Sequence, residues 1–325
     1  MTEKEVYELI DKIHTLKAEI QKVIIGQESV IDQLLISFMA GGHALLEGVP
    51  GLAKTLMIRT LAEAVHLQFK RIQFTPDLMP ADITGTEVIE EDTASGKRFF
   101  KFNKGPVFAN IILADEINRT PPKTQAALLE AMQEYEVTYG GETYPLAKPF
   151  FILATQNPVE QSGTFPLPEA QLDRFLLYIQ LGYPAEHEEY AILANTTSNK
   201  KNQIESVISV EEILAIQNLV REVPVSETLI SYVNNIVRAS RPETSSVETV
   251  KQWVQWGAGP RAGQAMLLTA KASALLAGRF AVTPKDIEKL AFPVMRHRML
   301  LNFKAEAANK QTDEITKNIL EAVKV

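Results

Sequence analysis

The hydrophobic positions of the first half of the chain switch between helical spacing and short continuous runs. Residues 3–22 carry apolar side chains at i, i+3, i+4 and i+7 spacing, which predicts an amphipathic helix, and a second helix follows over residues 28–40. Runs of four to six apolar residues are typical of strands buried in a parallel sheet. Strands are therefore predicted at residues 44–47, 69–75, 110–116, 150–155 and 176–180.

Two further segments predict hairpins that interrupt this alternation. One covers residues 88–102 and places its turn at residues 94–96. The other covers residues 135–144 and turns at Gly140 and Gly141. The first hairpin stands where a helix between strands would be expected.

The pattern changes after Tyr183 and Pro184, because residues 186–325 show helical spacing and hardly any strand pattern. Strands that alternate with helices predict an α/β fold with a doubly wound, mostly parallel sheet. We therefore expect an α/β domain at residues 1–183 and a smaller all-α domain at residues 184–325, with the hinge at Tyr183 and Pro184.

Composition narrows the class of protein. A length of 325 residues suggests about two domains, and 46% hydrophobic with 22% charged residues is ordinary for a globular chain. The absence of cysteine excludes disulfides and thiol chemistry. A net charge of −7 argues against a nucleic-acid binder. With no long apolar run and a charged N-terminus, we expect a cytoplasmic protein.

The histidines suggest no metal site. His14, His43, His66, His187 and His297 form no pair at ligand spacing. We interpret them as structural or surface residues.

A phosphate-binding loop is predicted between the strand at 44–47 and the helix after it. The Walker A pattern is G-x-x-x-x-G-K-[ST], and the chain departs from it at one position, Ala53, which fits there only with a negative φ. Lys54 would reach the outer phosphates of ATP and Thr55 would bind Mg²⁺. The alternative is a turn that ends in Lys-Thr by chance. The nucleotide-binding candidates are Gly48, Val49, Pro50, Gly51, Leu52, Ala53, Lys54, Thr55 and Leu56.

Two carboxylates, Asp115 and Glu116, end the apolar run at 110–116. Ligands bind at the carboxyl ends of strands in open α/β sheets, where the phosphate loop would also lie. Asp115 is expected to hold Mg²⁺ through water, and Glu116 to orient and deprotonate the attacking water. The alternative is an acidic turn exposed to solvent. Ahead of the first strand, Ile25 and Gly26 could cover an adenine ring, although a plain turn between helices fits equally well.

The motifs in combination resemble the MoxR family of AAA+ ATPases over nearly the whole chain. They are the loop GVPGLAKT, the acidic motif DEINR from Asp115, the segment ATQNP from Ala154, the segment LPEAQLDRF from Leu167, and GPRA from Gly259. Family members carry the same alanine in the phosphate loop. The two predicted hairpins match the helix-2 insert and the pre-sensor-1 hairpin of the branch that includes magnesium chelatase and MCM proteins.

The resemblance implies further site residues. Asn157 would be sensor 1, which positions the water near the γ-phosphate. Arg174 would be the arginine finger that reaches the neighbouring subunit's nucleotide. Arg261 would be sensor 2, which we expect to fold over the nucleotide of its own subunit. Arg119 is a second candidate for an intersubunit arginine.

The resemblance also implies a function. We expect an ATPase that forms a ring, a hexamer, and works as a chaperone-like remodelling or metal-insertion factor. Such proteins act on a client protein, often with a partner that carries a von Willebrand factor A domain. The alternatives are a nucleic-acid motor like the MCM helicases, which the acidic charge disfavours, and a nucleotide-gated scaffold without turnover.

Overall fold

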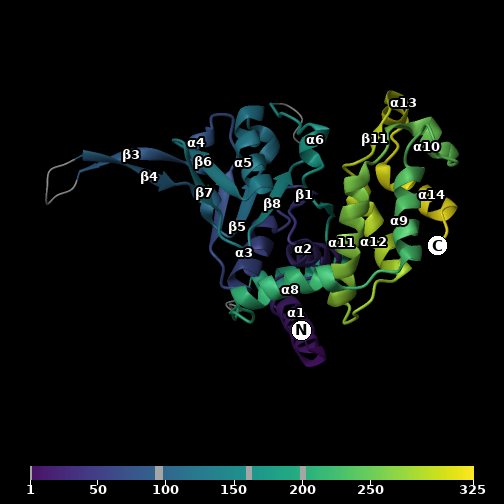
Figure 1. The fold of residues 1–325 in the computed structure, drawn as a ribbon, viewed down its shortest axis with the longest axis horizontal. Coiled ribbons are helices and arrows are strands. Elements are labelled where there is room, and N and C mark those ends of the chain that lie inside the picture. The colour runs from purple at the N-terminus through teal and green to yellow at the C-terminus, as the bar shows by residue number, and fades with distance from the viewer. Residues whose placement is uncertain (1, 92–97, 159–162, 198–202) are drawn as a thin grey trace.

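A five-stranded parallel sheet forms the centre of the computed structural model, which describes residues 2–91, 98–158, 163–197 and 203–325 (Figure 1). Its strand order is β2-β5-β8-β1-β9, and every neighbouring pair is parallel. The strands are β1 (Ala44–Gly48), β2 (Phe69–Gln73), β5 (Ile111–Asp115), β8 (Phe151–Gln156) and β9 (Leu177–Leu181). The predicted doubly wound parallel sheet is confirmed.

Alternate residues of the strands point into two cores, one on each face of the sheet. Leu46 belongs to the core formed with the helices α1 (Glu3–Gln21), α2 (Glu28–Met39) and α3 (Lys54–Ala64). Its neighbour Leu45 belongs to the core on the other face. The elements on that side are α4 (Pro80–Thr84), η1 (Pro106–Phe108), η2 (Ile117–Arg119), α5 (Pro122–Glu134) and α6 (Glu169–Leu172). The continuous apolar runs of the sequence are explained by this burial on both faces.

Both predicted hairpins are present, and both are two-stranded. The first consists of β3 (Gly85–Glu91) and β4 (Arg98–Lys104) and projects far from the body (Figure 1). Its turn, predicted at residues 94–96, lies outside the described residues. The second consists of β6 (Glu136–Tyr139) and β7 (Glu142–Pro145). The two hairpins meet where Phe102 stacks on Tyr139 and Tyr144, at centroid distances of 5.0 and 4.6 Å.

In the described residues after 183, helices make up most of the chain, as predicted for the second domain. One short antiparallel strand pair, which joins Val254 to Leu301, was not predicted. Within the described residues, no helix combines the length and the apolar character needed to cross a membrane. The elements are α7 (Glu186–Thr196), α8 (Val210–Glu222), α9 (Glu227–Ala239), α10 (Glu248–Trp253), β10 (Val254–Trp256), α11 (Pro260–Leu276), α12 (Pro284–Met295), β11 (Leu300–Leu301), α13 (Phe303–Ala307) and α14 (Thr312–Ala322).

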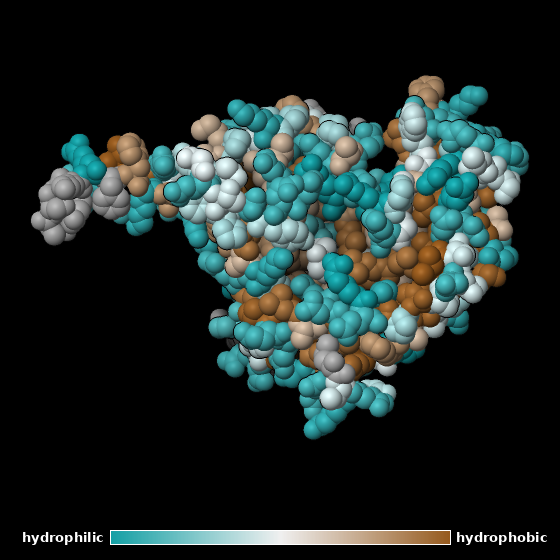
Figure 2. All heavy atoms as spheres, viewed as in Figure 1, coloured by the Kyte–Doolittle hydropathy of each residue, from teal (hydrophilic) through white to brown (hydrophobic). Residues whose placement is uncertain are grey.

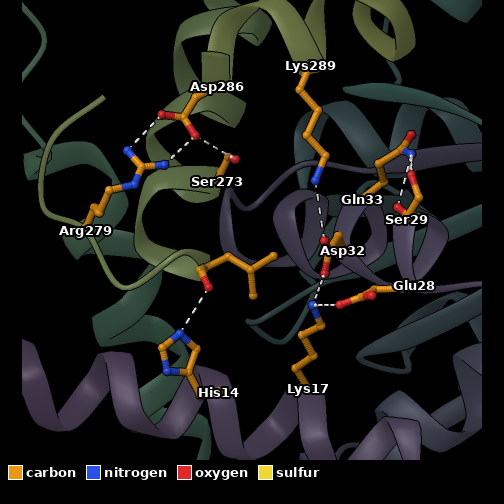
Figure 3. A network of polar contacts seen from close by, with 11 residues as sticks. His14, Lys17, Glu28, Ser29, Asp32, Gln33, Ser273, Arg279, Asp286 and Lys289 are labelled. Carbon is orange, nitrogen blue, oxygen red and sulfur yellow. Dashed lines mark hydrogen bonds and ion pairs between the residues drawn. The ribbon is translucent and has the colours of Figure 1, made fainter. Parts of the chain in front are cut away.

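Polar contacts tie the N-terminal helices to the helical half. Asp32 of α2 lies between Lys17 of α1, at 2.7 Å, and Lys289 of α12, at 3.4 Å (Figure 3). The ring of His14 lies 3.1 Å from the carbonyl oxygen of Leu276 at the end of α11. Helices before and after the boundary predicted at residues 183 and 184 therefore share contacts, and that boundary stays a prediction.

Candidate functional site

The phosphate loop connects the end of β1 to the start of α3. Lys54 donates a hydrogen bond from Nζ to the carbonyl oxygen of Gly48 at 2.7 Å, so its ammonium group lies over the loop. Gly51 has a φ of +86° and open space where a side chain would start. The unpaired N–H groups of a helix's first turn attract anions, and α3 presents its first turn here. The half-buried Thr55 lies in that same turn.

Ala53 adopts a left-handed conformation, with φ of 56° and ψ of 24°. The expectation of a negative φ at this residue is wrong. The loop must reverse direction immediately before α3, and its path fixes the backbone whatever the side chain. Since a Cβ atom in this region costs roughly 1–2 kcal/mol, the loop holds strain at Ala53.

The two predicted acidic residues lie at the same edge of the sheet as the phosphate loop. Asp115 ends β5 and is separated from β1 by β8, so the two strand ends are about 10 Å apart. Glu116 follows with a φ of +57°, so its backbone is left-handed like that of Ala53. A residue in this strained conformation is turned out of the strand direction.

Thr155 of β8 connects the two acidic residues. Its hydroxyl donates to Asp115 Oδ1 at 2.6 Å and accepts from the backbone N–H of Glu116 at 2.9 Å. Asn157, the predicted sensor 1, follows two residues later and is buried at the same edge. The sequence motif contained Thr155 without indicating its role, because a buried hydroxyl gives no pattern of its own.

Two polar residues of β2 complete the site and were missed in the sequence. The Arg71 guanidinium donates to Asp115 Oδ2 from Nη2 at 2.6 Å and from Nε at 3.1 Å. Gln73 donates from Nε2 to Glu116 Oε2 at 2.9 Å. The available signal was the alternation of β2, which sets both residues on one face beside the end of β5.

Arg119 contacts the Glu116 carboxylate of its own chain, with 2.9 Å between Nη1 and Oε2. The sequence offered Arg119 as an intersubunit arginine. In this structure its guanidinium instead shares Glu116 Oε2 with Gln73. Glu116 is therefore restrained by two donors.

Arg174 and Arg261 lie together at the opposite edge of the sheet. Both line one cavity of about 340 Å³ with Gly42 and His43, the residues that precede β1. Arg174 Nη1 donates to the carbonyl oxygen of Leu129 at 2.8 Å. The five residues of β1 separate this edge from the phosphate loop, which is roughly 15 Å at 3.3 Å per residue.

Arg261 pairs with Asp173, at 3.4 Å between Nη1 and Oδ2, and so does the buried Arg298, at 2.8 Å between Nε and Oδ1. The expectation that Arg261 folds over its own nucleotide site does not match this placement. The helical half packs beside the start of β9, and this packing brings α11 to Arg174 instead of to Lys54. Periodicity along the chain could not indicate on which side of the sheet the helical half would lie.

The predicted adenine cover forms a tight turn. Gly26 has a φ of +70°, and a side chain there would collide with Glu188 of α7. Gln27 donates to the carbonyl oxygen of Gly182 at 2.9 Å, which links this turn to the end of β9. Ile25 is half-buried beside it. Adenine contact by Ile25 and Gly26 stays a prediction.

The oxygen groups at this edge suit Mg²⁺. Mg²⁺ prefers hard oxygen ligands and usually keeps several waters between itself and protein carboxylates. The Thr55 hydroxyl lies in the first turn of α3, and the Asp115 carboxylate is held in place by Thr155 of β8 and Arg71 of β2 on the neighbouring strands. These two residues fit the ion by their chemistry and by their common edge.

Comparison with known proteins agrees with this arrangement. Residues 43–177 match the model of the ATPase family associated with various cellular activities (AAA), and residues 248–319 match the AAA lid domain. The chain is 42% identical to Chaperone MoxR1 of Mycobacterium tuberculosis, over 97% of this chain and 83% of that one. The chain belongs to the MoxR family of AAA+ ATPases. The resemblance noted in the sequence is thereby confirmed.

Two further comparisons extend the family relation to the whole fold. The uncharacterized protein YeaC of Bacillus subtilis is 44% identical over 94% of this chain and 92% of its own length. A crystal structure of a candidate ATPase from Cytophaga hutchinsonii superposes with a TM-score of 0.92 at 44% identity, and covers 99% of this chain and 97% of that one. This MoxR-family chain therefore has the AAA domain and helical lid of its relatives.

Proposed function

We propose that this MoxR-family chain hydrolyses ATP with Mg²⁺ at sites shared between neighbouring subunits of a ring, and uses the energy to remodel other proteins. One observation carries the proposal. The phosphate loop and its carboxylates occupy one edge of the sheet, whereas Arg174 and Arg261 occupy the other. The cavity that these arginines line lies one strand length, roughly 15 Å, from the chain's own phosphate loop. We therefore expect a second subunit to supply the phosphates that they contact.

The residues at the phosphate edge take distinct roles in this reaction. Lys54 pairs with the outer phosphates, and Thr55 and Asp115 hold Mg²⁺, which when bound neutralises charge on the phosphate oxygens. Glu116 accepts a proton from the attacking water, and Asn157 orients that water by its amide. Gln73 and Arg119 both donate hydrogen bonds to Glu116 Oε2, and these bonds restrain the carboxylate until the attacking water is in place.

Arg174 and Arg261 then serve the neighbouring nucleotide together. An arginine supplied from outside stabilises charge on the transferring phosphoryl group by on the order of 10³-fold or more in rate. The Asp173 carboxylate between Arg261 and Arg298 keeps these like charges near one another. Arg174 and Arg261 line one cavity, which supports a contact of both arginines with the same nucleotide.

Mixing inactive chains tests this arrangement. An Arg174→Ala chain keeps an intact phosphate edge, and a Lys54→Ala chain keeps an intact arginine edge. One interface in the mixture then has both, so some hydrolysis should return. Arg261→Ala mixed with Lys54→Ala should recover in the same way, since Arg261 lies beside Arg174.

If hydrolysis returned in the mixture with Arg174→Ala and not in the mixture with Arg261→Ala, Arg261 would instead act on the nucleotide of its own subunit. A Glu116→Gln chain is the control for chemistry, because it should bind ATP and release no phosphate. Hydrolysis by Glu116→Gln at the parent rate would remove Glu116 from its role as base.

The projecting hairpin is the proposed contact for a client protein. Brown, hydrophobic atoms lie near the far end of this hairpin (Figure 2). Ile89 and Phe100 face each other across its strands and are 63% and 71% exposed. An exposed apolar pair on a projecting ribbon is a site for protein contact rather than for core packing. The ring is proposed to be a hexamer that works with a von Willebrand factor A domain partner.

A further inference from the structure

The Asp115 carboxylate forms an ion pair with the guanidinium of Arg71. The Arg71 guanidinium places two N–H groups on Asp115 Oδ2, at 2.6 and 3.1 Å, while the Thr155 hydroxyl donates to Oδ1 at 2.6 Å. A carboxylate offers about four lone-pair positions, so these contacts fill about three of them. The two partners differ in exposure: the Asp115 side chain is nearly buried, at 11% exposed, whereas that of Arg71 is 48% exposed.

The position of Arg71 follows from the register of the sheet. Arg71 lies beside Leu113, and Gln73 lies beside Asp115, on adjacent parallel strands. A long side chain reaches the residue two positions further along a neighbouring strand, and Arg71 reaches Asp115 in this way. Its Nη2 also donates to Gln73 Oε1 at 2.5 Å. The guanidinium of Arg71 is thus held by Asp115 and by Gln73, and the rest of its side chain is exposed to solvent.

We propose that Arg71 is an internal counter-ion of Asp115 that competes with Mg²⁺ for this carboxylate and thereby sets the Mg²⁺ requirement of nucleotide binding. The inference rests on the nucleotide site proposed above. Arginine stays charged at any working pH, so its positive charge opposes a metal ion brought to the same carboxylate. When Mg²⁺ is absent, the same charge shields the nucleotide phosphates from Asp115.

These two effects have opposite signs, which separates them from loss of structure. Removing the charge with Arg71→Gln should lower the Mg²⁺ concentration for half-maximal nucleotide binding by about fivefold. In excess EDTA, the same variant should bind nucleotide more weakly than the parent chain. A residue that merely supports the fold would weaken binding in both conditions.

The experiment titrates the full chain with a fluorescent ADP analogue, at a series of Mg²⁺ concentrations and in EDTA. Arg71→Lys keeps the charge without the two-armed contact and should shift both values in the same directions by smaller factors, so it gives the answer should Arg71→Gln not fold. Arg98→Gln is the matched control, because Arg98 forms an exposed pair with Glu91 on the projecting hairpin. It should equal the parent in both conditions.

An unchanged Mg²⁺ midpoint in both Arg71 variants, or weaker binding with and without Mg²⁺, would overturn the inference and leave the proposed ATPase intact. A parent chain that binds no analogue under any condition would instead overturn the proposed function, and the inference with it. Thermal melting of each variant without nucleotide records whether it is folded.

Discussion

At the scale of single residues, the site is marked by backbone strain and by crowded carboxylates. Ala53 and Glu116 both adopt left-handed conformations at the edge where phosphates would bind. Such conformations persist where the surrounding structure fixes them, and they gather at functional sites. Here the tight path from β1 into α3 fixes Ala53, and the hydrogen bond from its N–H to Thr155 helps to fix Glu116.

Replacing Ala53 with glycine should stabilise the chain. The substitution removes a left-handed penalty of roughly 1–2 kcal/mol and adds about 0.5–1 kcal/mol of entropy loss, so we expect a net gain of about 0.5–1 kcal/mol. Urea unfolding of the nucleotide-free chain measures it. Ala62→Gly, inside α3, is the opposite control and should destabilise by about 1 kcal/mol. A loss of stability with Ala53→Gly would show that the loop is not strained there.

At the scale of elements, the two hairpins divide their aromatic residues between packing and exposure. Phe102 stacks against the second hairpin, whereas Phe100 points away from the protein. The projecting hairpin would be marginal as an isolated two-stranded unit, so its base depends on this stack.

Phe102→Ala should loosen both hairpins, and Phe100→Ala should not. Loss of the stack removes aromatic contacts worth about 0.5–1.5 kcal/mol each, beyond the buried area, whereas truncation of an exposed ring changes stability by less than about 0.5 kcal/mol. Hydrogen exchange of Gly85–Lys104 and Glu136–Pro145 measures the difference. Equal protection in the two variants would contradict the assigned packing role of Phe102.

A buried histidine joins α5 to the sheet. His43 Nδ1 accepts from the backbone N–H of Ile152 at 3.1 Å, and Nε2 lies 3.2 Å from the carbonyl oxygen of Met132, to which the neutral ring donates. Burial lowers the pKa of His43 to about 4. The unfolded chain therefore binds this proton more readily than the folded chain.

The stability contributed by His43 should be present in full above about pH 6.5 and should be lost as the pH falls toward 4. The pKa of His43 differs by about 2.5 between the unfolded and the folded chain, which corresponds to about 3 kcal/mol of unfolding free energy. His43→Asn keeps an acceptor for Ile152 and should flatten the fall in unfolding free energy between these pH values. His66→Asn, at an exposed histidine, is the control and should keep the parent slope. If the unfolding free energy of His43→Asn fell as steeply between these pH values as that of the parent chain, His43 would not be the cause of the fall.

At the scale of the whole molecule, the proposed function divides one reaction between the two edges of the sheet. The phosphate edge holds Lys54, Asp115 and Glu116, and the arginine edge holds Arg174 and Arg261. The helical half keeps the second group in place through the buried Arg298, which donates to the carbonyl oxygen of Phe175 at 2.7 Å. Under the proposed function, a chain built in this way needs a second copy to assemble one complete site.

Nucleotide should therefore promote self-association of the isolated chain. A bound nucleotide offers phosphate oxygens to the arginine edge of a neighbour, and arginine–phosphate contacts are among the stronger charge-assisted hydrogen bonds. Sedimentation velocity with and without a non-hydrolysable ATP analogue tests this, with Arg174→Ala as the variant that should associate less. A strict monomer at high concentration in both conditions would contradict the ring.

The sequence by itself determined the five strands of the central sheet, the two hairpins and the edge at which the phosphate loop is predicted. Buried runs, turn residues and the loop motif are local, so they specify Lys54, Asp115 and Glu116 without tertiary information. The partners Arg71 and Gln73 were decided by strand order, because β2 lies beside β5 although about forty residues separate them. The place of Arg261 was decided by how the helical half packs on β9. That packing depends on shape and on contacts between distant residues, which no local pattern records.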